Sequence, residues 1–322
     1  MHNNVTHKIK QFLFVLIKLS IVVGAFYFIY NKLVENENLK FNEFLLLIKE
    51  NRTFSAKNII FLIVLSGFNW FFEILKWNYL VKTVTSISLP AALEQSLGGL
   101  TASLITPNRI GDYGAKAIYF PKGFRKKIVL LNLLGHIAQM TITTLFGIVG
   151  LYLFVDQYNV NIDFNKILRF AIIILFVGIV LAFIIKNIEF KIKGFSIKRI
   201  LLFIQEIPFK THNYNLLFSL IRYLIFSFQF YYLLSIFGVE VGYPTAMVVI
   251  TSMYFLASIV PSISIFDVVI KGSVAVFLFD FLGVNEITIL SVSTLMWIFN
   301  FIVPSIFGSY FVLNFKLPNT EE

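Results

Sequence analysis

The residues in this sequence best suited to a chemical role form two acid–base pairs of the form Asp-x-x-x-Lys: Asp112 with Lys116, and Asp267 with Lys271. Both pairs lie in apolar segments, and the four-residue spacing places the two head groups on one helix face in the favourable acid-first order. A charge in mid-membrane costs roughly 2.5–3.5 kcal/mol even on permissive scales, so such groups pair, reach the interface or line a wet cavity. Two interpretations remain open: neutralised pairs that fix the structure, or pairs that gate a central cavity or carry protons through it.

The first pair follows a polar turn with the sequence Pro107-Asn108-Arg109-Ile110-Gly111. Arg109 stands beside the N-terminus of the next expected helix, where backbone N–H groups favour an anion. Its planar guanidinium matches a phosphate or carboxylate, and Gly111 supplies backbone freedom at the turn. The turn, Asp112 and Lys116 are therefore candidates for substrate binding. The alternative for Arg109 is structural pairing with Asp112 or Glu94.

Secondary candidates lie on the neighbouring apolar segments. Glu73 and Lys76, three residues apart, are expected to pair. His136, with Asn132 and Gln139 near the same face, either hydrogen-bonds between helices or lines a cavity. Arg222 is expected to extend its head group to the membrane interface.

The composition indicates that lipid is the solvent. Of the 322 residues, 58% are hydrophobic and 14% are charged, with a mean hydropathy of +0.82, whereas soluble domains are about 45–50% apolar. These values exclude disorder, a disulfide scaffold and an ordinary cytosolic enzyme. The chain has no Cys, which excludes thiol chemistry and Fe–S or Cys–zinc sites. No metal or other cofactor is expected.

Hydropathy predicts an all-α polytopic membrane protein, a single integral membrane domain over 1–322. A bilayer core of about 30 Å needs roughly 20 apolar helical residues. Six spanning helices are expected, at 12–30, 57–81, 128–154, 168–185, 215–237 and 286–315. Two further apolar stretches, 91–121 and 243–282, break around Pro107 and Pro261 and are interpreted as re-entrant hairpins. Pro304 predicts a kink in the last span.

The two broken stretches resemble each other. Seventeen residues separate Pro90 from Pro107, and seventeen separate Pro244 from Pro261; each second proline precedes an Asp-x-x-x-Lys pair. This predicts two repeats, 57–154 and 215–315, each a span, a hairpin and a span. Three crossings separate spans 57–81 and 215–237, so the repeats have opposite orientation, as in many secondary transporters. Pro107 and Pro261 are assigned gating or turn roles in the hairpins.

The net charge of +10 is explained by topology rather than by nucleic acid. Basic residues cluster at 122–127 and 186–199, which the positive-inside rule places in the cytoplasm together with both termini. Segment 186–199 either acts as a topology signal alone or also binds anionic lipid head groups.

The turn 107–112 with Lys116 resembles the Pro-x-Arg-x-Gly-acid signature of the lysylphosphatidylglycerol synthase transmembrane-region family, which comprises flippase-like membrane proteins. The second hairpin, 261–271, resembles that family's second proline motif, although residues 262–266 read Ser-Ile-Ser-Ile-Phe where the family is usually glycine-rich. The resemblance covers about 57–315. It implies a multi-pass protein of a bacterial-type cytoplasmic membrane, without the aminoacyl-transferase half of the full-length synthases.

We therefore expect a transporter rather than an enzyme, moving an anionic or aminoacylated lipid or amphiphile across the membrane. Membrane lipids are the expected partners, with a separately encoded lipid-modifying enzyme as a further one. The sequence lacks the G-x-x-x-x-G-K-[ST] phosphate loop, so the driving force is a gradient or mass action. Two alternatives remain open: a membrane-embedded transferase acting on a lipid carrier, and a non-catalytic scaffold for a partner enzyme.

Overall fold

The computed structural model describes residues 15–24, 27, 30, 55–104, 106, 109–160, 191–192, 195–259 and 267–318; at 191–192, 195–199 and 267–271 it describes the backbone alone. Over these residues the protein is helical, apart from a small antiparallel hairpin of β1 (Lys191–Ile192) and β2 (Phe195–Ser196). The expected all-α class is confirmed for the described chain.

Four helical segments are long and apolar enough to cross a membrane. They are α3 (Ala56–Val81), α6 (Arg125–Tyr158), α9 (Phe209–Ile236) and the continuous run Glu286–Asn314. They coincide with four of the six predicted spans. A helix over Val15–Gly24 covers part of the first predicted span, and the predicted span 168–185 lies outside the described residues.

The last spanning segment is not a uniform α-helix. It consists of α12 (Glu286–Trp297), a π-helical stretch η2 (Ile298–Ile302) and α13 (Val303–Asn314). Pro304 lies just inside α13. Because proline has no N–H to donate to the preceding turn, the regular α-helical hydrogen bonding is disrupted in the residues just before Pro304. The sequence predicted this distortion at Pro304, but not its π-helical form.

Shorter helices occupy both stretches that were expected to break. The first contains α4 (Leu89–Leu104) and α5 (Ile110–Ile118); the second contains α10 (Tyr243–Ile259) and α11 (Asp267–Asp280). The first predicted break is confirmed, because α4 ends at Leu104 and α5 begins at Ile110. The second, at 260–266, lies outside the described residues. Pro107, Asn108 and Pro261 themselves lie outside the described residues, and re-entry of the hairpins stays a prediction.

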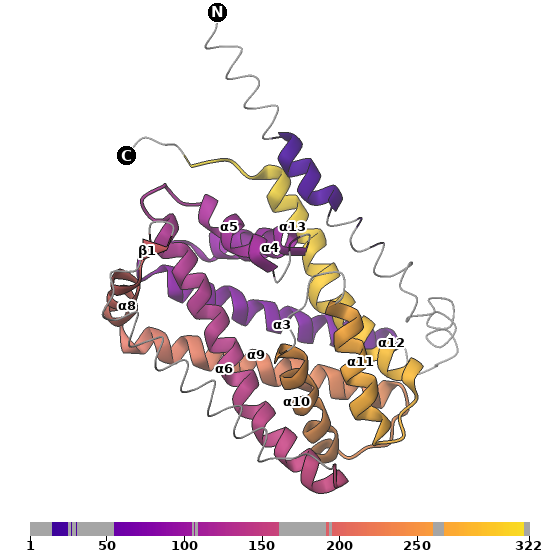
Figure 1. Cartoon of the computed structure of the whole chain (residues 1–322). Coiled ribbons are helices and arrows are strands. Elements are labelled where there is room, and N and C mark those ends of the chain that lie inside the picture. The colour runs from indigo at the N-terminus through magenta and orange to yellow at the C-terminus, as the bar shows by residue number, and fades with distance from the viewer. Residues whose placement is uncertain are drawn as a thin grey trace, which may run out of the picture.

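Helices α3 and α9 run antiparallel, side by side, through the middle of the molecule (Figure 1). Contacts along their length define the direction: Asn58 meets Tyr232 near one end, and Tyr79 meets Tyr214 at the other. Their polar side chains meet at mid-length, where Glu73 contacts Arg222. This pair of helices brings residues from the two halves of the chain together at its centre.

Two other antiparallel contacts join the halves, both through glycines. On α6, Gly150 packs against Thr251 of α10. On α13, Gly308 packs against Leu97 and Thr101 of α4. In both places a methyl group on the glycine would overlap the facing helix, so the close approach requires glycine.

Buried apolar side chains form two main clusters. The first, around Trp77, Leu80 and Ile128, joins α3, α4, α5 and α6. The second, around Phe230 and Phe279, joins α9, α10, α11 and α12 and also includes Leu62 of α3 and Phe154 of α6. Large apolar side chains also cover the outside of α3 and α6, where Phe68, Ile148 and Val149 are exposed. Such a surface is suited to lipid.

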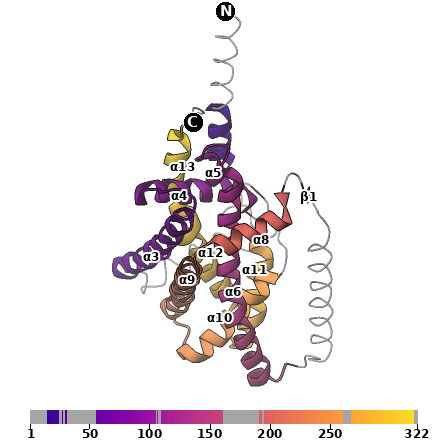
Figure 2. The ribbon, with the colours of Figure 1, turned by 90° about the vertical axis from the view of Figure 1, so that its left-hand side faces the viewer.

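Helix α8 (Ile197–Glu206) lies beside the β-hairpin (Figure 2).

Candidate functional site

The first candidate cluster surrounds Asp112 and Lys116 on α5. Lys116 Nζ lies 3.2 Å from Asp112 Oδ2, and both side chains are 3% exposed. Asn132 of α6 joins them: its amide Nδ2 donates to Asp112 Oδ2 at 2.9 Å, and its Oδ1 accepts from Lys116 at 2.9 Å. The ammonium also lies 4.5 Å from the centre of the Trp77 ring. The predicted Asp112–Lys116 pair is confirmed and is held by two further helices.

Glycines allow α5 to approach α4 closely enough to bury this pair. A methyl group at Gly99 would overlap Asp112 Oδ1, and one at Gly111 would overlap the Ala102 carbonyl oxygen. The Thr106 hydroxyl accepts from the Gly111 N–H at 2.8 Å, which satisfies one free donor at the start of α5. Gly111 therefore serves close backbone packing, more than the turn conformation that the sequence suggested.

Arg109 caps the start of α5 with a left-handed backbone, φ 57°. Its Nε donates to Ser103 Oγ at 3.4 Å, and its guanidinium lies 5.6 Å from the Phe301 ring. Its charge is close enough to act on Asp112, His136 and Arg222. Within the described residues Arg109 makes no ion pair, so the pairing with Asp112 or Glu94 that we considered is wrong.

A second charged cluster joins α3 to α9. Glu73 Oε2 lies 2.8 Å from Lys76 Nζ and also pairs closely with Arg222 Nη1. Arg222 is held as well by Gln139 of α6, whose Oε1 accepts at 3.2 Å, and by Asn69. The Glu73–Lys76 pair is confirmed. The prediction that Arg222 extends to the interface is wrong, because its partner on α3 holds the guanidinium in the interior, where its side chain is 18% exposed.

A chain of buried amides extends from this second cluster. Asn69 Nδ2 donates to Asn300 Oδ1 at 2.9 Å, and Asn300 Nδ2 donates to Gln229 Oε1 at 2.9 Å. Gln229 Nε2 ends the chain on the Leu62 carbonyl at 3.1 Å. The sequence analysis missed these residues; isolated amides within apolar spans are the signal that could have identified them.

Helix α6 links the two clusters. Asn132 and His136 contact Asp112 of the first cluster, while Gln139 contacts Arg222 of the second. The spacing of these three residues places them on one helix face. The expectation that they share a face is confirmed, and the structure adds that each contacts a charged partner.

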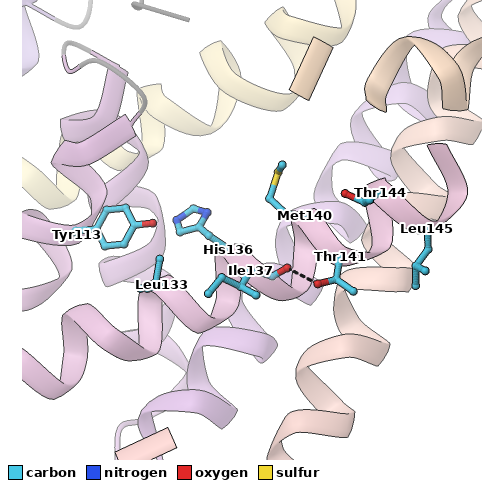
Figure 3. A pocket seen from close by; sticks show the side chains of 8 residues that line it. All are labelled: Tyr113, Leu133, His136, Ile137, Met140, Thr141, Thr144 and Leu145. Carbon is cyan, nitrogen blue, oxygen red and sulfur yellow. Dashed lines mark hydrogen bonds between the residues drawn. The ribbon is translucent and has the colours of Figure 1, made fainter. Parts of the chain in front are cut away.

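An open groove of about 490 Å³ leads to the first cluster along the outer face of α6 (Figure 3). It is lined by Tyr113, Leu133, His136, Ile137, Met140, Thr141, Thr144 and Leu145. At one end His136 lies beside Tyr113, with ring centres 5.3 Å apart. His136 Nε2 is also 3.2 Å from Asp112 Oδ2, and its side chain is 34% exposed against 3% for Asp112. His136 therefore connects an apolar groove to a buried carboxylate.

Comparison with known protein families identifies the chain. A family model described as the lysylphosphatidylglycerol synthase TM region matches residues 15–308. The chain belongs to this family. Both charged clusters lie within the match, and the protein is therefore an integral membrane protein of a family linked to lipid modification. None of the curated proteins compared with the chain matches it.

Two further predicted site residues, Asp267 and Lys271, lie on α11. Their side chains lie outside the described residues. In the parts of the chain that the structure describes, no three His, Asp or Glu side chains gather closely enough to hold a metal ion.

Proposed function

We propose that this protein moves an anionic or aminoacylated lipid across the cytoplasmic membrane as a flippase-like transporter. The groove on α6 is the observation that carries the proposal. Its apolar walls suit acyl chains, and His136 at its end bonds to the buried Asp112. A lipid can then keep its tails in the bilayer while its head group enters a polar interior.

The charges of the two clusters favour an anionic group. Around them stand four basic side chains (Lys76, Arg109, Lys116 and Arg222) and two acidic ones (Glu73 and Asp112). Uncompensated charge is costly in this environment, so a bound phosphodiester would balance the surplus. The guanidinium of Arg109 offers it a planar fork. Asp112 or Glu73 would receive the ammonium of an aminoacyl group.

The helix contacts support an inverted repeat as the moving framework. The first repeat contains α3 to α6, and the second contains α9 to α13. Helix α6 packs on α10 through Gly150, and the corresponding α13 packs on α4 through Gly308. An exchange of equivalent contacts is what a pseudo-two-fold axis in the membrane plane produces, and in such transporters the two repeats rock about a central site.

Orientation and partners complete the proposal. We place both termini and the basic segment 122–127 on the cytoplasmic side, following the positive-inside rule. Membrane lipids are the substrates, and the enzyme that modifies them is a separate protein. Movement is driven by a gradient or by the lipid concentration difference.

Filling the groove tests the proposed lipid path. Ile137 lines the groove, whereas Ile148, on the same helix, is exposed but lies outside its lining. In vesicles containing phosphatidylglycerol or its lysyl ester, Ile137→Trp should slow lipid exchange between leaflets by tenfold or more. Ile148→Trp should leave the rate unchanged. Equal rates for both variants would exclude the groove as the path.

Removing the charges tests the head-group site separately. Arg109→Ala and Asp112→Asn, each confirmed as folded by its melting temperature in detergent, should reduce the lipid exchange rate, because the head group loses its counter-charge in the interior. Arg109→Lys should retain part of the rate. Unchanged rates in well-folded variants would rule out this mechanism.

A further inference from the structure

Helix α9 carries a row of buried polar atoms without partners, on the face toward α6. Within the described residues, the Oδ1 atom of Asn215 and the Oγ atom of Ser219 are buried and accept or donate no hydrogen bond. The side chain of Ser219 belongs to a residue that is 0% exposed. One turn further, the Tyr223 hydroxyl is also buried without a hydrogen-bond partner among the described residues. The four-residue spacing aligns these atoms along one side of the helix.

Helix α6 closes over this row. The amide Nδ2 of Asn215 donates to the Leu134 carbonyl at 3.1 Å, and Gln139 Nε2 donates to the Ser219 carbonyl at 3.3 Å. Further along, the Tyr223 ring stacks on Phe146, with ring centres 5.0 Å apart. Asn215, Ser219, Tyr223 and Gln139 thus define a polar contact between the two helices, which we call the α6–α9 seam.

The seam differs from the buried amide contacts elsewhere in the interior. Asn69, Asn132 and Asn300 each use their amide groups on neighbouring side chains. The Asn215 Oδ1 acceptor and the Ser219 hydroxyl, one helical turn apart, have no such hydrogen bonds within the described residues. Buried polar groups in native proteins are bonded either to protein or to ordered water, and a bound water needs two to four polar partners. Asn215 and Ser219 provide acceptors and a donor of this kind.

The seam leads to the second charged cluster. Gln139 donates to the Ser219 carbonyl through its Nε2 and accepts from Arg222 Nη1 through its Oε1 at 3.2 Å. Arg222 in turn pairs with Glu73. One amide therefore contacts both the backbone of Ser219, beside the unpartnered hydroxyl, and the buried ion pair.

We propose that the α6–α9 seam binds a file of water molecules running from Asn215 past Ser219 to Gln139. These waters solvate the Glu73–Arg222 pair from the N-terminal end of α9. Such a file lets the ion pair separate without losing all contact with solvent. It is distinct from the lipid-facing groove on the other side of α6, which ends at His136.

Isotope exchange at a single thiol tests the file of water. The chain has no Cys, so Ser219→Cys introduces the only S–H group, whose infrared stretch is separate from other protein bands. Ser227→Cys is the matched control: Ser227 is also 0% exposed on α9, but its hydroxyl donates to the Tyr223 carbonyl at 2.7 Å. On transfer of the protein in lipid vesicles to D₂O, the thiol at 219 should exchange at least tenfold faster than that at 227.

The outcomes separate the alternatives. Slow exchange at both positions means a dry seam and overturns the proposal. Rapid exchange at both means that α9 opens as a whole, which also overturns a localised file. As a second measurement, Ser219→Ala should lower the melting temperature in detergent, because it removes a water ligand; a rise would indicate a dry, unsatisfied hydroxyl. Neither measurement involves lipid movement, so failure of the water-file proposal can be distinguished from failure of the flippase proposal.

Discussion

At the scale of single residues, the interior retains charge because a third group supports each buried ion pair that the structure describes. Asn132 bonds to both members of the Asp112–Lys116 pair, and Gln139 supports Arg222 beside Glu73. Taking charges out of water is costly, and mutual attraction offsets that cost only when further hydrogen bonds satisfy the remaining atoms. The amides are therefore as necessary to these sites as the charges.

This dependence predicts non-additive effects on stability. Asp112→Asn leaves the Lys116 ammonium buried beside neutral groups, which should cost about 3–5 kcal/mol, and Asp112→Asn with Lys116→Met should cost less than the sum of the single changes, with a coupling of about 0.5–3 kcal/mol. Melting temperatures in detergent would measure this, with the exposed Asp156→Asn as a control that changes little. Additive losses would contradict the buried pairing.

Residues close in sequence were predictable, and residues distant in sequence were not. The four-residue spacing of Asp112 and Lys116 indicated their contact because helical geometry alone brings them together. Arg222 and Glu73 are 149 residues apart, and their contact depends on how α9 packs against α3. Without that packing, Arg222 near a helix end was interpreted as an interfacial residue.

At the scale of elements, the position of α5 depends on backbone contact with α4. The Gly111 N–H bonds to Thr106, and its Cα faces the Ala102 carbonyl without a side chain between them. This contact holds Asp112, the next residue, inside the bundle. The prolines in the sequence predicted the break between α4 and α5, but not how closely the two helices pack.

Substitutions at two glycines on α5 distinguish the effect of close packing on stability from the effect of helix propensity. Gly111→Ala should destabilise the protein by about 1–3 kcal/mol, since the new methyl group meets backbone atoms that cannot move aside easily. Gly114→Ala, where nothing lies within 4 Å, should be neutral or stabilise by up to about 1 kcal/mol through better helix propensity. Thermal unfolding in detergent distinguishes them, and similar melting temperatures would contradict the close α4–α5 packing.

At the scale of the whole molecule, the two halves are joined by contacts that the sequence could only suggest. The shared proline spacing indicated a repeat, but the α6–α10 and α4–α13 contacts arise from tertiary packing through glycine. The hydropathy of the chain identified the four long helices correctly, since their length and composition are local properties. Which helices touch each other is not encoded locally.

If transport requires the repeats to rock, locking α6 to α10 should stop it. A Cβ at Gly150 would lie 3.0 Å from Thr251 Cβ, which is shorter than the spacing of about 3.5–4.5 Å that a disulfide needs, so the two helices must move apart slightly to accept the bond. With no native Cys to interfere, Gly150→Cys combined with Thr251→Cys should cross-link on oxidation. The cross-link should abolish lipid exchange in vesicles, and reduction should restore it.

A pair within the proposed second repeat provides the matched control for that experiment. Gly272 of α11 faces Leu290 of α12, where a Cβ would lie 3.2 Å from Leu290 Cδ2. Joining Gly272→Cys to Leu290→Cys with a short bifunctional thiol reagent leaves the two repeats free to move relative to each other, so exchange should continue. Full transport in the oxidised Gly150→Cys and Thr251→Cys protein would contradict rocking at this interface. Loss of transport in both cross-linked proteins would instead mean that motion within the second repeat is also required.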